Sequence, residues 1–117
     1  MKAIEISWNG KVVCQAGLPK NGNLSAIVNL IRKPVSSKKK NWMSSLSVGG
    51  LSVENGDYRF LRFFEKNMTE KDMVSLRIVE VEKTSRPKSQ YVETKLERSK
   101  AKKKYLKELT KELEAKK

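Results

Sequence analysis

The sequence predicts a mainly β protein, a small antiparallel sandwich or partial barrel followed by a long charged C-terminal α-helix. Two observations predict this fold. Short segments of alternating apolar and polar residues, separated by Asn-Gly and glycine-rich turn signals, fill the first part of the chain. The last part lacks Gly and Pro and is rich in Lys, Glu, Leu and Ala, a composition typical of helices. We therefore expect a compact β-rich domain over residues 1–83, a linker over 84–90 and a basic, charged helix over 91–117.

A hairpin is expected at the start of the chain. Residues 3–8 alternate between apolar and polar or small side chains, which is the two-residue period of a strand. Asn9-Gly10 follows directly, and both residue types accept the positive φ angles of a two-residue type I′ turn. With that turn, the returning strand over residues 11–15 places Val13 opposite Ile6.

The next segment, residues 24–32, fits two templates. Its apolar residues alternate as in a strand, yet several of them also lie at helical spacing. The content of β-branched residues favours the strand. Lys33-Pro34 ends this element, and residues 35–41 are expected to form a polar loop.

Further strands are expected up to residue 81. Residues 42–48 alternate up to Gly49-Gly50, where we expect a turn or a bulge, and a short strand over 51–54 leads to the turn signal Asn55-Gly56-Asp57. The aromatic segment 58–64 is a strand or a short helix. The alternation over residues 73–81 is the clearest strand signal, and it predicts that three side chains of that strand face inward: Val74, Leu76 and Ile78.

The charge of the chain limits its partners. Lys and Arg number 26 against 13 Asp and Glu, and the net charge of +13 gives a positive field that attracts polyanions. Nucleic acid and an acidic protein surface are the expected partners, and the excess charge is densest after residue 83. No apolar stretch approaches the roughly 20 residues that cross a bilayer, so no membrane insertion is expected. One cysteine and no secretory signal pattern predict an intracellular, cytoplasmic protein.

Catalysis is not expected. The chain has no histidine, the residue used most often as a general base and as a metal ligand, and no nucleophile elbow or phosphate-binding loop. We predict no catalytic residues, no metal site and no cofactor. Cys14 lies among apolar residues and is expected in the core. The carboxylates Asp57, Glu65, Glu70 and Asp72 are better explained as loop residues than as an acid pair or a magnesium site.

The tail carries the main candidate site. Five cations lie within seven residues of the expected helix, and they repel one another unless an acidic partner approaches. The alternative is a solvated face that keeps the protein soluble. The predicted polyanion-binding residues, which include three lysines of the 35–41 loop, are Arg98, Lys100, Lys102, Lys103, Lys104, Lys38, Lys39 and Lys40.

A second group of residues combines aromatic rings with arginines. Bases can stack on aromatic faces while arginines bind phosphates, although core packing explains most rings in the 58–64 segment. The candidates for stacking or for contact with a protein partner are Trp42, Tyr58, Arg59 and Arg62. Three leucines of the expected helix could bring a partner helix or a second copy into contact: Leu106, Leu109 and Leu113.

These features predict a non-enzymatic binding protein. The first hypothesis is a polyanion-binding protein that contacts nucleic acid through its basic helix without reading sequence. The alternative is a protein-interaction module, such as an inhibitor, an immunity protein or an assembly accessory protein, that docks on an acidic surface.

The β-rich part also resembles a family of small uncharacterised bacterial proteins. The resemblance covers roughly residues 1–83, rests on strand and turn positions, and implies no activity. It is carried by the Asn9-Gly10 hairpin, residues 24–27, residues 46–51, Asn55-Gly56-Asp57, the aromatic segment and residues 71–80. The chain departs from the family pattern at Lys71, where the pattern has glycine, and at Phe63 or Phe64, where it has tryptophan. The basic tail has no counterpart in that pattern.

Overall fold

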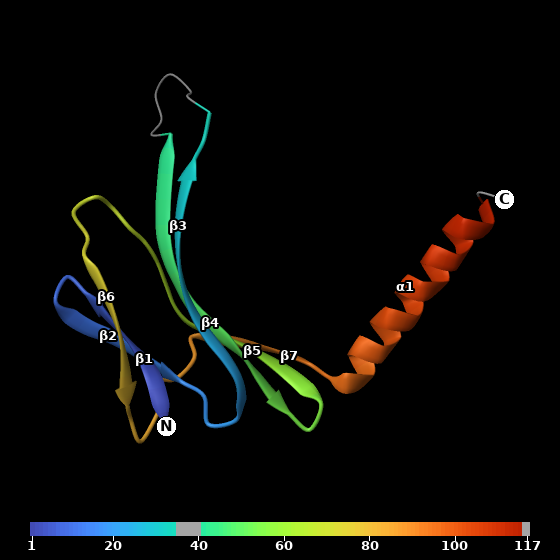
Figure 1. Cartoon of the computed structure of the whole chain (residues 1–117), viewed down its shortest axis with the longest axis horizontal. Helices are drawn as coiled ribbons and strands as arrows, with labels where there is room; N and C mark the ends of the chain where they lie inside the picture. The colour runs from blue at the N-terminus through green and yellow to red at the C-terminus, as the bar shows by residue number, and fades with distance from the viewer. Residues whose placement is uncertain (35–40, 116–117) are drawn as a thin grey trace.

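The computed structural model describes residues 1–34 and 41–115. In these residues the chain is mainly β and forms two antiparallel sheets and one C-terminal helix (Figure 1), which confirms the predicted fold class. The sheets do not close into a barrel. The elements are β1 (Lys2–Trp8), β2 (Lys11–Gly17), β3 (Asn21–Arg32), β4 (Trp42–Glu54), β5 (Asp57–Asn67), β6 (Val74–Glu80), β7 (Ser89–Glu93) and α1 (Lys95–Ala115).

Each sheet orders its strands differently. The smaller sheet has the order β2-β1-β6, and the larger has the order β3-β4-β5-β7. Asn9-Gly10 and Asn55-Gly56 both have the positive φ angles of type I′ turns, which confirms the hairpin expected at the first and the turn expected at the second. Residues 24–32 are part of the strand β3, as their β-branched content favoured.

The two sheets share one small core. Ile6, Trp8, Cys14 and Ala16 of the smaller sheet pack against residues of the larger one, and Cys14 is buried as expected. The larger sheet contributes Leu46, Val48 and Phe63. The helix contributes no buried residue and projects away from both sheets (Figure 1). For this reason the radius of gyration is 19.7 Å, well above the roughly 13 Å of a compact chain of this length.

The register of the first hairpin differs from the prediction. Ile6 pairs with Cys14 and not with Val13, because the pairing shifts by one residue between Ile6 and Ser7. The extra residue forms a β-bulge, which the sequence pattern did not indicate.

Gly49-Gly50 lies inside β4 and does not form a turn. The predicted bulge is present, as a register shift between Val48 and Gly49 in the pairing of β4 with β5. A Cβ atom on Gly49 would lie 2.7 Å from the carbonyl oxygen of Leu61, and one on Gly50 would overlap that of Asn23. Both glycines are therefore required by the close approach of neighbouring strands, not by an unusual φ angle.

The prediction that three side chains of β6 face inward is wrong for two of them. Leu76 and Ile78 are 49% and 65% exposed, whereas Val74 packs against the core. The three side chains do share one face of β6, because they alternate along the strand and lie opposite Trp8, Ile6 and Ile4 of β1. The larger sheet does not cover that face, since the two sheets diverge beyond the core (Figure 1).

The predicted start of the helix is also corrected. Residues 89–93, which span the end of the expected linker and the start of the expected helix, form β7 and pair with β5. The helix begins at Lys95, four residues later than predicted. Strand β7 thus ties the start of the helix to the larger sheet.

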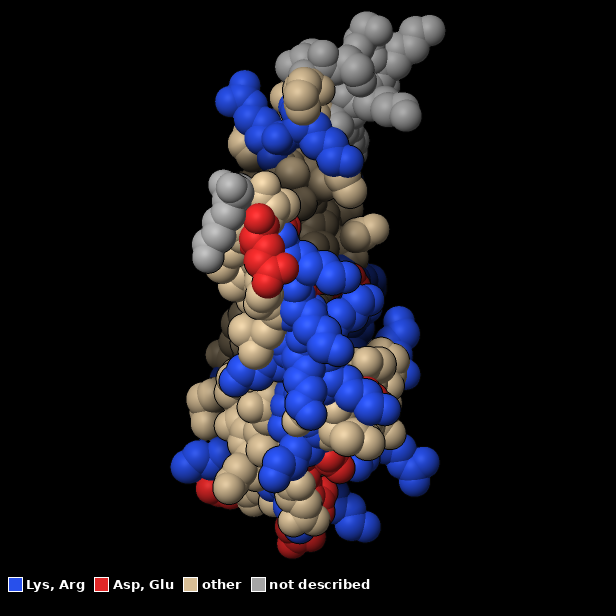
Figure 2. Space-filling model, turned by 90° about the vertical axis from the view of Figure 1, so that its right-hand side faces the viewer, with Lys and Arg blue, Asp and Glu red and all other residues tan. Residues whose placement is uncertain are grey.

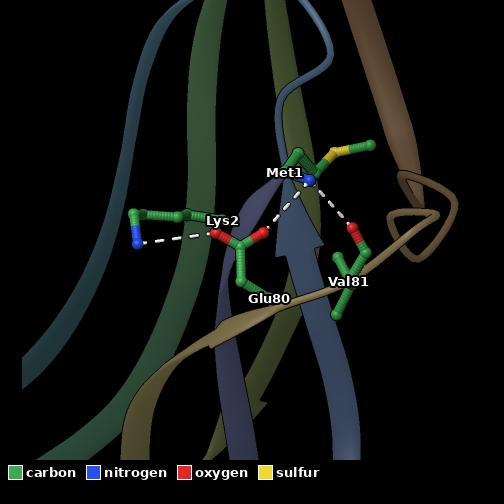
Figure 3. Close-up of polar contacts among 4 residues, drawn as sticks. All are labelled: Met1, Lys2, Glu80 and Val81. Atoms are coloured by element: carbon green, nitrogen blue, oxygen red, sulfur yellow. Dashed lines mark hydrogen bonds and ion pairs between the residues drawn. The ribbon is translucent and has the colours of Figure 1, made fainter.

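Polar contacts join the start of β1 to the end of β6. The ammonium group of Met1 donates to the carbonyl oxygen of Val81 at 2.9 Å and lies 3.4 Å from the carboxylate of Glu80, which also lies 3.5 Å from the amine of Lys2 (Figure 3). The hydrogen bond and charge of that ammonium group lower the pKa of Glu80. These contacts fix the edge strand β6 against β1.

Candidate functional site

Local contacts define where the helix begins. The hydroxyl of Thr94 accepts a hydrogen bond at 3.1 Å from the backbone N–H of Glu97, which is the N-cap arrangement of a Thr-x-x-Glu sequence. The carboxylate of Asp57, the first residue of β5, accepts a second bond at 3.1 Å from the N–H of Lys95. Two of the first free N–H groups of α1 are therefore satisfied, one of them by the sheet.

Arg98 holds the first turn of the helix against the same hairpin. Its guanidinium lies over the ring of Tyr58, 3.6 Å from the ring centroid, and donates to the carbonyl oxygens of Gly56 and Glu93. Arg98 was predicted to bind a polyanion and Tyr58 to stack on a partner. The structure instead places the two side chains on one another, so either role would require this contact to open.

The lysines of α1 form a stripe along one side of the helix. Positions separated by three, four, seven and eleven residues lie on the same side of an α-helix. Five lysines have this spacing, and we call them the lysine stripe: Lys100, Lys103, Lys104, Lys107 and Lys111. All five are exposed, and in the part of the chain that the structure describes none of them forms an ion pair.

The stripe differs from the set predicted from the sequence. It keeps Lys100, Lys103 and Lys104, but Lys102 lies on the opposite side of the helix, where it shares a face with the exposed leucines. Lys107 and Lys111 were missed. Lys107 and Lys111 could have been identified from their helical spacing to Lys103 and Lys104. The prediction rested instead on the density of cations in a seven-residue window, which selects residues that are neighbours in sequence and not residues on one side of the helix.

The lysine stripe is part of a wider basic region. Figure 2 shows Lys and Arg side chains gathered on the side of the molecule from which α1 projects. Residues 95–104 contain six basic residues and one acidic residue, whereas residues 105–115 contain two and three. The positive charge of the helix is therefore concentrated near the sheet.

Arg59 and Arg62 lie in β5 and have different surroundings. The guanidinium of Arg62 donates to the carboxylate of Glu65 at 3.0 Å, and that of Arg59 lies 3.5 Å from the side-chain oxygen of Gln90. Because they are three residues apart in a strand, they lie on opposite faces of the sheet. The structure does not bring the two predicted arginines together.

The aromatic segment is divided between the two faces of the larger sheet. Phe63 is buried in the core and Phe64 packs against it, while Phe60 and Tyr58 lie on the face turned away from the smaller sheet. On this outer face Phe60 pairs with Tyr91 of β7, with ring centroids 6.1 Å apart. Both rings are exposed. Tyr91 was not predicted as a partner contact, because the sequence placed it in the helix.

The remaining predicted residues lie at the start of β4, outside the described residues, or on the leucine side of α1. Trp42 is half exposed at the start of β4, with the guanidinium of Arg32 at 5.6 Å from its ring centroid. Lys38, Lys39 and Lys40 lie outside the described residues. Leu106, Leu109 and Leu113 are exposed on the helix, and contact through them stays a prediction.

The acidic residues considered as a magnesium site are engaged separately. The carboxylate of Asp72 accepts hydrogen bonds from Thr69 and from the side chain of Asn9, and these bonds lower its pKa. Asp57 caps the helix and Glu65 pairs with Arg62. Among the described residues, no group of three Cys, Asp or Glu side chains could hold a metal ion. None of the helices in these residues has the length and apolar character needed to span a membrane.

No family model, curated protein or solved structure matches the chain. The resemblance to a bacterial family thus stays a prediction, and the function has to be argued from the site alone.

Proposed function

We propose that the protein binds nucleic acid without reading its sequence, with the phosphates held along the lysine stripe of α1. The observation that carries this proposal is that five exposed lysines lie on one side of the helix and, among residues 1–34 and 41–115, no acidic group pairs with them. From Lys100 to Lys111 the stripe is about 16 Å long at 1.5 Å per residue. One strand of duplex DNA presents a phosphate about every 3.4 Å, so the stripe faces about five phosphates.

The anchoring of the helix supports the same role. A cationic segment without contacts would order itself only on binding, and the ordering would weaken the complex. Here the N-cap of Thr94 and the contact of Arg98 with Tyr58 fix the first turn to the sheet. The stripe is thereby presented in one orientation before a partner arrives.

A membrane surface fits the helix less well. An interfacial helix needs a continuous apolar face opposite its charges. On α1 the side opposite the lysine stripe carries Arg98 and Lys102 in its first half, and leucines only in its second half. We also propose binding and not catalysis, because the chain contains no histidine to act as a general base.

Two single substitutions on the same helix test the proposal. Lys107→Glu reverses a charge in the middle of the stripe, and Lys102→Glu makes the same change in net charge on the opposite side. Fluorescence anisotropy of labelled single-stranded and duplex oligonucleotides should show affinity about tenfold or more weaker for Lys107→Glu and near normal for Lys102→Glu. Circular dichroism should show equal helix content in both variants.

Two outcomes would contradict the proposal. Equal losses in the two variants would indicate a response to net charge and not to the stripe. The absence of any binding by the full-length protein at low salt would remove the function itself.

A second candidate is a protein-interaction module that docks on an acidic protein surface. It is favoured by Trp42, a large exposed ring beside Arg32 of the kind that anchors protein interfaces. Affinity for such a partner would fall strongly in Trp42→Ala and depend weakly on salt. Nucleic-acid binding through the stripe would show the reverse, and so one salt series on the wild type and Trp42→Ala distinguishes the two candidates.

A further inference from the structure

The ends of β3 and β4 form an arm with apolar residues on both faces. Strand β5 pairs with β4 only as far as Ser45, so the last three pairs of β3 and β4 form a two-stranded ribbon that extends beyond the rest of the sheet (Figure 1). Six large apolar side chains of the two strands are 48–67% exposed: Ile27, Val28, Leu30, Ile31, Trp42 and Met43. Two-stranded ribbons are marginally stable alone in water, and apolar exposure of this extent marks an interaction surface.

The free edge of β3 runs along this arm. Strand β3 is at the edge of its sheet, and within the described residues it pairs only with β4. An edge strand presents unpaired N–H and C=O groups, which proteins normally protect with charges, prolines, bulges or covering segments. From Asn21 to Ile31, eleven residues of β3 contain no charge and no proline.

The other described edges are protected. The edge of β2 is covered by Thr84 and Ser85, which bond its backbone at Gly17 and Gln15. Strand β6 carries Arg77 and Glu80, and β7 has only five residues. Strand β3 therefore stands apart as a long edge open to another strand.

We propose that β3 pairs with β3 of a second copy of this chain, antiparallel and about a two-fold axis near Ile27, which joins the two larger sheets into one of eight strands. A two-fold contact requires a surface that complements itself. An axis at Ile27 places Ala26 opposite Val28 and Leu24 opposite Leu30, so apolar residues meet on the inner face. Arg32, the strand's one cation, then lies opposite Gly22.

The distribution of charge is compatible with this dimer despite the net charge of +13 on each copy. Strand β3 is one edge of the larger sheet, and β7, which leads into α1, is the other. Pairing through β3 thus places the two basic helices at opposite ends of the joined sheet. At that distance their repulsion is largely screened at physiological salt.

Sedimentation equilibrium of the full-length protein tests the proposal. The wild type should approach twice its 13.4 kDa as its concentration rises. Leu30→Lys, at a side chain 67% exposed, should weaken the dimer by at least tenfold, because it places a cation in the apolar pairing. Ile78→Lys is the matched control, since its side chain is 65% exposed on the edge strand of the other sheet, and it should dissociate as the wild type does. Leu109→Lys on the helix should also have no effect.

Cross-linking gives a second, independent readout. With Cys14→Ser to remove the native thiol, Ile27→Cys should form an intermolecular disulfide on mild oxidation, because residues at the axis of an antiparallel pair have Cβ atoms about 5 Å apart. Ile78→Cys in the same background should not. A wild type that remains monomeric at all concentrations overturns the proposal. So does a dimer that survives Leu30→Lys but is lost in Ile78→Lys or Leu109→Lys. If Leu30→Lys does not fold, the absence of the Ile27→Cys cross-link overturns the proposal by itself.

Discussion

The salt dependence of binding follows from the number of lysines in the stripe. Each phosphate neutralised releases counterions, so the logarithm of the association constant falls with the logarithm of salt with a slope of about −0.9 per contact on duplex DNA and about −0.7 on single strands. Five contacts give slopes of about −4.5 and −3.5. Between 50 and 200 mM salt, affinity should thus fall roughly 500-fold for a duplex and roughly 130-fold for a single strand.

Replacing one lysine with a neutral residue should lower the slope by one fifth. Lys107→Gln removes a cation of the stripe, and Lys102→Gln removes one from the other side of the same helix. Anisotropy titrations at five salt concentrations should give a slope smaller by about 0.9 on duplex for the first variant and an unchanged slope for the second. A slope close to −1 for the wild type, or equal slopes for the two variants, would refute the assignment of the phosphate contacts to this side of α1.

Three further predictions concern the residues that support the site. Arg98→Ala removes the stacking on Tyr58 and two hydrogen bonds to backbone carbonyls, so it should lower the free energy of unfolding by about 1–3 kcal/mol and raise hydrogen exchange in the first turns of α1. Arg98→Lys should recover little of the stability or of the protection from exchange, because an ammonium group cannot stack and bond as a guanidinium does. The hydrogen bonds that Asp72 accepts from Thr69 and Asn9 lower the pKa of its carboxyl group. The contribution of this group to stability is therefore complete above its ordinary pKa of 3.8 and is lost as the pH falls through the lowered value. Urea denaturation should show that Asp72→Asn is less stable than the wild type at pH 7, and that the difference shrinks towards pH 3. Burial raises the pKa of the Cys14 thiol, so a thiol reagent should react slowly with the native protein and rapidly in denaturant, and fast reaction at neutral pH without denaturant would contradict the predicted core position.

Features that depend on a few neighbouring residues could be predicted from the sequence. Asn9-Gly10 and Asn55-Gly56 form type I′ turns because the geometry of the turn requires residues that accept positive φ angles. The alternation of Val74, Leu76 and Ile78 correctly placed them on one face of β6. It could not show whether another sheet covers that face, because coverage depends on how far the two sheets diverge.

The candidate site was predictable only in outline. The basic character of the tail is a property of composition, but the start of the helix depends on whether residues 89–93 pair with β5. The Thr94-x-x-Glu97 capping sequence marks the true start, whereas the Gly- and Pro-free composition of the tail does not show where the helix begins. Likewise, the engagement of Arg98 with Tyr58 joins residues 40 positions apart, and no local pattern indicates it.

The two proposals combine into one expectation about the length of the ligand. In the proposed dimer seven spacings of about 4.8 Å separate the two β7 strands across the sheet, a distance of about 34 Å. The end of β7 is level with Asn21, six residues from the axis at Ile27, so the two helix starts are also offset by twelve residues, about 40 Å, along the strands. The two helices therefore begin about 52 Å apart. A duplex of about fifteen base pairs spans the same distance at 3.4 Å per pair. Only longer duplexes can then occupy both lysine stripes at once, and their apparent affinity should rise beyond that length through the effective concentration of the second site. Because Leu30→Lys leaves each stripe intact while separating the copies, it should abolish the rise with length without weakening the binding of short duplexes. A rise that persists in Leu30→Lys would mean that length acts through statistical placement on one helix, and not through the joined sheet.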